Sequence, residues 1–239
     1  MKKNIKVNFL VVGAQKSGTT ALDRYLRQHP EIEMGSKKEL HFFDHEKNFL
    51  GKANYDQYHQ HFAGHHSKIR GECTPIYMYW QPAMERIYQY NPDMKIIAVL
   101  RDPIARAFSH WNLERERNAD HADFSFAIRE EKKRCEAALP LQHRVFSYID
   151  RGFYDQQIKR IWRYFPRMQT LFIQHENLKR HPQITMKTIA DFLDIADFKD
   201  IQPLDINSTK YSTTLSEDDY KYLKEIFDDS IKETEKLLS

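Results

Sequence analysis

The chain has 239 residues, of which 41% are hydrophobic and 30% are charged, and its formal net charge is +3. This hydrophobic fraction is enough for a globular core, and no apolar run approaches the roughly 20 residues of a membrane span, so we predict a soluble protein without a membrane partner. The small net charge and the lack of interleaved aromatic and basic residues argue against a nucleic acid partner.

Residues 1–6 are basic like the start of a signal peptide, but the apolar run after them covers only residues 9–12. A signal peptide needs a longer apolar region, so we expect a cytoplasmic protein. Cys73 and Cys135 lack metal-ligand spacing and fit free thiols in a reducing compartment. The histidines are mostly scattered singly, so no metal is expected. No repeat or Pro/Gly/Ser-rich linker is found, which predicts a single domain over residues 1–239.

A strand, a tight loop and a helix are expected in succession over residues 9–26. Residues 9–12 are apolar without polar alternation, which is typical of a strand buried on both faces of a parallel sheet. The next residues supply two glycines, a lysine and three hydroxyl groups, and apolar residues then recur at helical spacing. The first N–H groups of a helix lack internal partners and its dipole is positive there. The pattern therefore predicts a phosphate-binding loop, with a plain surface turn as the alternative.

This loop departs from the loop of ordinary ATP- and GTP-binding proteins. Gly13 and Gly18 have the spacing of the pattern G-x-x-x-x-G-K-[ST], but Thr19 stands at the lysine position and the lysine is Lys16. Kinases of that kind need the later lysine on the nucleotide and the next hydroxyl on Mg²⁺. The departure argues against the main alternative function, a nucleotide or small-molecule kinase.

Residues 37–44 place ionisable groups directly beside two phenylalanines. Desolvation by the rings disfavours the charged form of Glu39, whereas the neighbouring lysines favour it, and such opposing effects can tune a general base. His41 lies two residues further along. The segment is a candidate catalytic site, and a solvated charged turn anchored by its phenylalanines is the alternative.

A second buried strand is predicted over residues 95–100. Ligands of open α/β sheets bind at the carboxyl ends of the strands, so Arg101 and the hydroxyl of Ser109 are expected to face the phosphate loop. A guanidinium can bind a phosphate through two hydrogen bonds. An ion pair of Arg101 with Asp102 or Glu72 is the alternative.

Residues 112–139 carry dense charges of both signs and are expected to form solvated helices joined by a polar turn near Asp120. The other expected elements are a short strand that ends near residue 73, a β-rich run over 170–174, a short helix or lid within 54–62, and helices over 82–90, 155–164, 186–193 and after Ser216.

Three motifs in this order resemble the sulfotransferases that use 3′-phosphoadenosine 5′-phosphosulfate (PAPS), most closely the branch that includes the heparan sulfate 3-O- and N-sulfotransferases and bacterial relatives. Residues 13–22 resemble the 5′-phosphosulfate loop of that family, and residues 38–44 resemble its catalytic segment. Residues 100–103 with Arg106 and Ser109 resemble its 3′-phosphate motif. The resemblance implies a single α/β domain with a central parallel sheet flanked by helices and a P-loop-like topology.

The resemblance also implies roles for the site residues. Glu39 takes the proton of the acceptor, and His41 supports or orients Glu39. Lys16 meets the bridging oxygen, where charge develops as the S–O bond breaks. PAPS is the implied cofactor and leaves as 3′,5′-adenosine bisphosphate. The residues implied to bind it are Gln15, Lys16, Ser17, Gly18, Thr19, Thr20, Arg101, Ser109 and Lys210.

Two departures from this family concern the acceptor. The heparan sulfate enzymes have lysine in their equivalent of residues 72–75, where this chain has Cys73, and their closing loop has a glycine, whereas Tyr211 follows Lys210 here. The polysaccharide acceptor is therefore not carried over, and the predicted acceptor is a hydroxyl or amine of a small molecule or carbohydrate. The predicted reaction is an in-line transfer of the sulfuryl group. A nucleotide-sensing module is a third alternative, which would have no use for Glu39.

Overall fold

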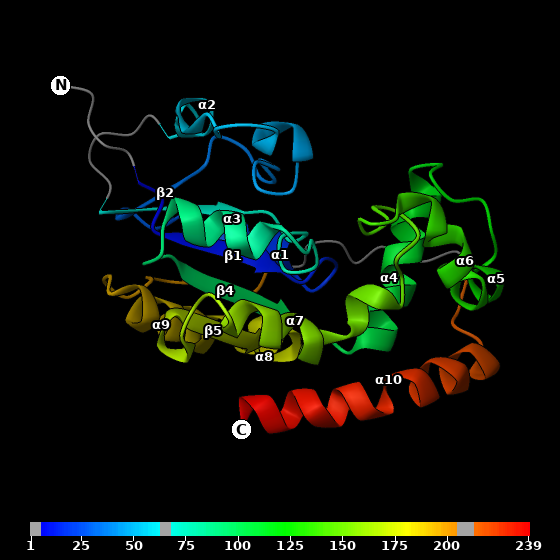
Figure 1. Cartoon of the computed structure of the whole chain (residues 1–239). Helices are drawn as coiled ribbons and strands as arrows, with labels where there is room; N and C mark the ends of the chain where they lie inside the picture. The colour runs from blue at the N-terminus through cyan, green and yellow to red at the C-terminus, as the bar shows by residue number, and fades with distance from the viewer. Residues whose placement is uncertain (1–5, 63–67, 205–212) are drawn as a thin grey trace. The chain divides into compact units, whose positions relative to one another are not determined.

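The structure is a computed structural model that describes residues 6–62, 68–204 and 213–239. The chain divides into two compact units, whose elements are labelled in Figure 1. The sheet unit comprises Met1–Leu100 and Arg160–Ile206, and the helical unit comprises Arg101–Lys159 and Asn207–Ser239. The single domain over residues 1–239 stays a prediction.

The sheet unit contains a five-stranded sheet in the order β2-β3-β1-β4-β5, and all neighbouring strands are parallel. Its strands are β1 (Phe9–Gly13), β2 (Ile32–Met34), β3 (Ile69–Cys73), β4 (Lys95–Leu100) and β5 (Thr170–Gln174). The predicted α/β class with a central parallel sheet is confirmed. β2 is the one strand of this sheet that the sequence does not predict, because it is short and Glu33 interrupts its apolar residues.

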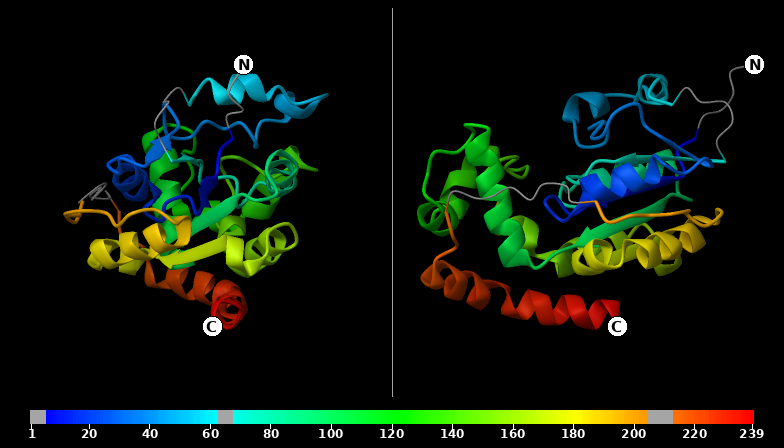
Figure 2. Two further views of the ribbon diagram at one scale, coloured as in Figure 1. Left: turned by 90° about the vertical axis from the view of Figure 1, so that its left-hand side faces the viewer. Right: turned by 180° about the vertical axis from the view of Figure 1, so that it is seen from behind.

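Helices cover both faces of this sheet. Phe9 and Val11 of β1 belong to a buried core that includes residues of α1 (Thr19–Leu26) and α9 (Pro182–Leu193). α3 (Ala83–Tyr90) lies on the other face, as the front view in Figure 1 and the rear view in Figure 2 show. Since side chains alternate along a strand, β1 is buried on both faces, which explains its uninterrupted apolar run.

The sheet unit also contains shorter helices and one close backbone approach. A Cβ atom on Gly71 of β3 would lie 2.0 Å from the ring of Phe9, so this register requires glycine. The shorter helices are η1 (Glu46–Phe49), α2 (Tyr55–His59), η4 (Arg167–Gln169) and α8 (His175–Arg180).

The helical unit is built on α4 (Pro103–Glu116) and α10 (Glu217–Leu238), which pack against each other. Asp102 caps α4 by accepting a hydrogen bond from the N–H of Ala105 at 2.7 Å. Ser216 caps α10 in the same way, as its sequence pattern predicts. The smaller helices of this unit are α5 (Phe124–Arg129), α6 (Glu131–Cys135), η2 (Glu136–Ala138) and η3 (Asp150–Gly152), while α7 (Tyr154–Trp162) begins here and ends in the sheet unit.

The prediction that residues 112–139 are solvated throughout is wrong for three carboxylates. Glu114, Asp120 and Glu131 are all at least 95% buried. Asp120 accepts hydrogen bonds from the Tyr148 hydroxyl and from the Arg134 guanidinium, each at 2.7 Å. Glu131 accepts the backbone N–H groups of residues 149 and 150. The hydrogen bonds of Asp120 and Glu131 offset part of the cost of burying these carboxylates.

Two smaller predictions concern the thiols and the membrane. Cys73 and Cys135 are both free. Within the described ranges, no helix combines the length and the apolar character needed to cross a bilayer.

Candidate active site

The predicted phosphate-binding loop lies between β1 and the start of α1. The Ala14 N–H donates to the Val99 carbonyl of β4 at 2.8 Å, and the Ser17 N–H donates back to the Ala14 carbonyl at 3.1 Å. Gly18 precedes α1 with φ of 88°, and a Cβ there would lie 3.0 Å from the His175 ring. The loop therefore turns tightly and requires glycine where the helix begins.

Ser17 is the most enclosed residue of this loop. Its side chain is fully buried, and its Oγ has no hydrogen-bond partner among the described residues. A buried hydroxyl without a partner is costly, and a ligand that accepts its hydrogen bond would remove that cost. Because the start of a helix also favours negative charge, this supports the binding of an anion at the loop.

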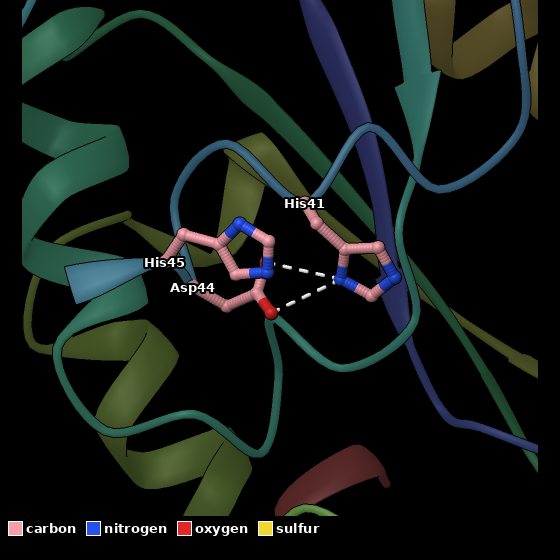
Figure 3. A group of neighbouring side chains, drawn as sticks. All are labelled: His41, Asp44 and His45. Atoms are coloured by element: carbon pink, nitrogen blue, oxygen red, sulfur yellow. Dashed lines mark hydrogen bonds and ion pairs between the residues drawn. The ribbon is translucent and has the colours of Figure 1, made fainter. Parts of the chain in front are cut away.

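The predicted catalytic segment brings Glu39, His41 and Asp44 together. His41 Nδ1 lies 3.0 Å from one Asp44 oxygen and 3.2 Å from the other. Figure 3 marks these two contacts by dashed lines. On the other side of the ring, His41 Nε2 lies 3.5 Å from Glu39 Oε2, and Lys38 Nζ also contacts Glu39. Glu39 and His41 are about one third exposed, whereas the Asp44 side chain is fully buried. The histidine is thus held between an accessible and a buried carboxylate.

These contacts set the charges of the segment. Burial raises the pKa of Glu39, but the hydrogen bonds and positive charges of His41 and Lys38 outweigh burial and lower the pKa to about 2. The hydrogen bonds of His41 to Asp44 and Glu39 raise its pKa to about 9 against the effect of burial. At neutral pH Glu39 is therefore a carboxylate, and His41 carries its proton.

The phosphate-binding loop and the catalytic segment meet at Cys73, the last residue of β3. The Glu39 N–H donates to the Cys73 carbonyl at 2.9 Å, and Cys73 Sγ lies 3.6 Å from the Thr19 carbonyl. The Cys73 side chain is 1% exposed, and burial raises the pKa of its thiol. Cys73 is thus a neutral side chain packed against the start of α1.

The structure also groups His41, Asp44 and His45. One donor atom from each lies within 4.8 Å of the others, and the two rings stack with centroids 5.7 Å apart (Figure 3). The expectation of singly scattered histidines is wrong for this pair. Asp44 and Glu39 face the two ring nitrogens of His41, so hydrogen bonding within the protein already engages that side chain. The expectation of no metal stays a prediction.

The predicted site residues fall into three sets. The loop residues 15–20 and the pair Glu39 and His41 belong to the sheet unit and are joined through Cys73. Arg101 and Ser109 belong to the helical unit, so their part in the site stays a prediction. Lys210 lies outside the described residues. Of the two ion-pair partners considered for Arg101, Asp102 caps α4, and Glu72 is buried among hydroxyl groups of the sheet unit.

The sequence assigns no role in this segment to three residues that the structure places there, although Glu72 was considered as an ion-pair partner of Arg101. Asp44 is within the predicted segment but has no predicted role, although its spacing of three from His41 is a signal that could have shown one. Tyr77 and Glu72 are distant in sequence and reach the segment from below: the Tyr77 hydroxyl accepts the Phe42 N–H at 2.9 Å and donates to Glu72 at 2.8 Å.

Comparison with known proteins identifies the family of this chain. The family model of the sulfotransferase domain matches residues 6–234, and the chain belongs to this family. The predicted recognition as a sulfotransferase is therefore confirmed, and no finding supports the kinase alternative.

Similar proteins include two sulfotransferases from other organisms and one solved structure. Heparan sulfate glucosamine 3-O-sulfotransferase 6 of Mus musculus is 31% identical over 84% of this chain and 56% of its own length. The membrane-associated sulfotransferase kil1 of Dictyostelium discoideum is 24% identical over 83% of this chain and 59% of its own length. The chain thus spans a little over half the length of these relatives. A crystal structure of a sulfotransferase from Alicyclobacillus acidocaldarius superposes with a TM-score of 0.84 at 28% identity, covering 98% of this chain and 96% of that one.

Proposed function

We propose that this protein transfers a sulfuryl group from PAPS to a hydroxyl or amine of a small-molecule or carbohydrate acceptor. The observation that carries the proposal is the junction at Cys73, which holds the Glu39 backbone on one side and contacts the start of α1 on the other. A loop suited to an anion and a carboxylate that is ionised at neutral pH are thus joined by one residue of β3. The proposed location is the cytoplasm, where two free thiols are stable.

The phosphate-binding loop holds the 5′-phosphosulfate. PAPS supplies a sulfuryl group that is already bonded to a phosphate leaving group. Gln15, Ser17 and Gly18 surround the anion, and the hydroxyls of Thr19 and Thr20 and the N–H groups at the start of α1 bind it. Lys16 stabilises the negative charge that collects on the bridging oxygen. The buried Ser17 hydroxyl supports this arrangement, because a bound anion would supply the hydrogen-bond partner that it lacks among the described residues.

Arg101, Ser109 and Lys210 bind the 3′-phosphate. Arg101 follows β4 directly, and Ser109 is 3% exposed on α4. A guanidinium that forms two hydrogen bonds with this phosphate would distinguish PAPS from ATP. The support for these three assignments is the resemblance of their motifs to the 3′-phosphate site of the family.

Glu39 accepts the proton of the acceptor. As the acceptor oxygen or nitrogen bonds to sulfur, the S–O bond to the 5′-phosphate breaks, the acceptor proton passes to Glu39, and 3′,5′-adenosine bisphosphate leaves with the bonding electrons. His41 is the weaker candidate because Asp44 and Glu39 keep it protonated at neutral pH. The low pKa of Glu39 means that the proton is transferred late, when the new bond has made it acidic.

The test is sulfate transfer without Mg²⁺. Purified protein is incubated with PAPS labelled in the sulfuryl group and with separate acceptors, namely p-nitrophenol, simple amines and glucosamine-containing oligosaccharides. We expect the label to pass to at least one acceptor, with an equal amount of 3′,5′-adenosine bisphosphate released. Phosphate transfer from ATP to the same acceptors, with a strict need for Mg²⁺ and no sulfate transfer, would contradict the proposal.

A further inference from the structure

A group of buried hydroxyls and one carboxylate lies beneath the catalytic segment and does not take part in the proposed chemistry. We propose that Tyr77 and Glu72 are positioning residues, which fix the backbone of Phe42 and Phe43 and thereby hold His41 and Asp44 in their mutual geometry. The expected change in turnover rests on the proposed function, whereas the expected change in backbone amide exchange is independent of that function.

The Tyr77 hydroxyl uses its full hydrogen-bonding capacity. It accepts the N–H of Phe42 at 2.9 Å and that of Phe43 at 3.4 Å, and it donates its own proton to Glu72 Oε1 at 2.8 Å. A phenol has one proton to donate and can accept two hydrogen bonds. The directions of these three hydrogen bonds are therefore fixed. The Tyr77 oxygen can accept hydrogen bonds from both amides because its own O–H group donates to Glu72.

Glu72 is the final acceptor of this series of hydrogen bonds. Besides Tyr77, it accepts hydrogen bonds from the hydroxyls of Thr74 at 2.5 Å and Tyr58 at 2.6 Å. These four residues are at most 1% exposed, so water does not replace a lost partner. A carboxylate buried in β3 is costly without such donors, and with three of them it becomes a fixed anchor.

The anchored backbone carries the site residues on both sides. His41 precedes Phe42, and Asp44 follows Phe43. His41 has φ of 56° and Glu39 has φ of 62°, a left-handed backbone that residues other than glycine adopt only when their surroundings hold it.

The carbonyls of the two phenylalanines are fixed as well. Asn48 Nδ2 donates to the Phe42 carbonyl and Arg86 Nη1 donates to the Phe43 carbonyl, each at 2.9 Å. Tyr77 is the side chain that fixes the amide side. Because a small displacement of a catalytic group can lower turnover strongly, this anchor should affect rate more than cofactor binding.

Two other tyrosines provide matched controls. Tyr58 donates to the same Glu72, but its hydroxyl makes no contact with the amides of the segment among the described interactions. Tyr90 accepts the backbone N–H of Val7 at 2.9 Å, before the start of β1. Its ring lies 5.6 Å from that of Phe43 between centroids, and replacement by phenylalanine keeps this ring. Replacing each tyrosine by phenylalanine removes one buried or partly buried hydroxyl, so only Tyr77→Phe combines that loss with free Phe42 and Phe43 amides.

The first measurement is backbone amide exchange of Phe42 and Phe43 by NMR. In Tyr77→Phe we expect exchange at both amides to accelerate by about tenfold or more, since their hydrogen bonds are lost, whereas Tyr58→Phe and Tyr90→Phe stay near the wild type. In the wild type, the Tyr77 hydroxyl proton should exchange slowly and lie close to both amides. This wild-type observation keeps the test informative if Tyr77→Phe fails to fold. A fast-exchanging hydroxyl, or equal exchange in all three variants, would overturn the proposal.

The second measurement is turnover with the best acceptor from the sulfate-transfer screen. Tyr77→Phe should lower kcat by about tenfold or more while KM for PAPS stays within about twofold, and Tyr90→Phe should retain kcat. An equal loss of kcat in Tyr77→Phe and Tyr90→Phe would contradict the positioning role, because it would show that Tyr77 contributes only to overall stability. Absence of turnover in the wild type counts against the proposed function, and the exchange experiment then still decides the role of Tyr77.

Discussion

Residues 37–44 in the sheet unit and residues 112–139 in the helical unit are both rich in charge, but they use it differently. In the first segment Glu39 and His41 remain about one third exposed, and their charges face each other. In the second, Glu114, Asp120 and Glu131 are buried, and hydrogen bonds within the unit engage Asp120 and Glu131. Charge that stays accessible is available to a ligand, whereas the buried carboxylates Asp120 and Glu131 make their hydrogen bonds within the fold.

The same comparison separates two ways of supporting a carboxylate. Glu39 is kept ionised by the hydrogen bonds and positive charges of His41 and Lys38, which are themselves partly exposed. Glu131 is held by the N–H groups of residues 149 and 150, which are part of the folded backbone. Replacement of Glu39 should therefore change activity, and replacement of Glu131 should change stability.

The largest effect is expected for Glu39→Gln. This variant keeps the shape of the side chain and removes its basicity, so kcat should fall by on the order of 10²-fold or more. Affinity for 3′,5′-adenosine bisphosphate, measured by calorimetry, should stay near the wild type. The free energy of unfolding should change little, because the side chain is partly exposed.

His41→Ala is the control for this assignment. It should cost less activity than Glu39→Gln if His41 only orients the carboxylate. If Glu39→Gln keeps most of its activity while His41→Ala loses it, the two roles must be exchanged, and the proton of the acceptor then goes to the imidazole.

Arg101→Ala tests whether an accessible charge of the helical unit serves the ligand. The loss of a charge-assisted hydrogen bond, roughly 1.5–3 kcal/mol, should raise KM for PAPS by about tenfold or more. The change in kcat should be smaller, since the 3′-phosphate is remote from the bond that breaks. A large fall in kcat at saturating PAPS with unchanged KM would show that Arg101 has another role.

A smaller effect is expected for Glu131 and appears in stability. Burial raises the pKa of Glu131 from 4.5 to about 7, although its two backbone hydrogen bonds oppose the rise. The folded state therefore binds this proton more tightly than the unfolded state, and stability is lost as the pH rises from about 4.5 to about 7. Between pH 5.5 and 7.5, this group should lower the free energy of unfolding by about 2 kcal/mol.

Denaturant unfolding of the wild type and of Glu131→Gln at both pH values isolates this contribution. The difference between the two proteins should shift by that amount from one pH to the other, because the amide does not titrate. The same shift in both proteins would assign the pH dependence to other groups.

The strands of the sheet were predictable where they consist of a continuous run of apolar or β-branched residues. β1, β4 and β5 contain uninterrupted apolar or β-branched runs, whereas β2 has only three residues with Glu33 in the middle. The burial of Asp120 and Glu131 was not predictable from charge pattern, since Tyr148 and the N–H groups of residues 149 and 150 approach only in the folded chain.

The site divides in the same way. The phosphate-binding loop and the catalytic segment, residues 38–44, are each a continuous stretch of sequence, so composition and motifs identify each of them. The Tyr77 hydroxyl accepts the N–H groups of Phe42 and Phe43 from about thirty-five residues further along the chain and donates to Glu72, and no local sequence pattern predicts these contacts. The meeting of loop and segment at Cys73 is likewise a property of the parallel pairing of β1 with β3.

The most direct test of the central claim, that this site binds and uses PAPS, is a thermal-shift titration with 3′,5′-adenosine bisphosphate and ATP, each with and without Mg²⁺. Binding to the native state raises the melting temperature with ligand concentration. We predict that 3′,5′-adenosine bisphosphate stabilises the protein at lower concentration than ATP and does so without Mg²⁺. Equal stabilisation by ATP, together with a strict requirement for Mg²⁺, would contradict the account.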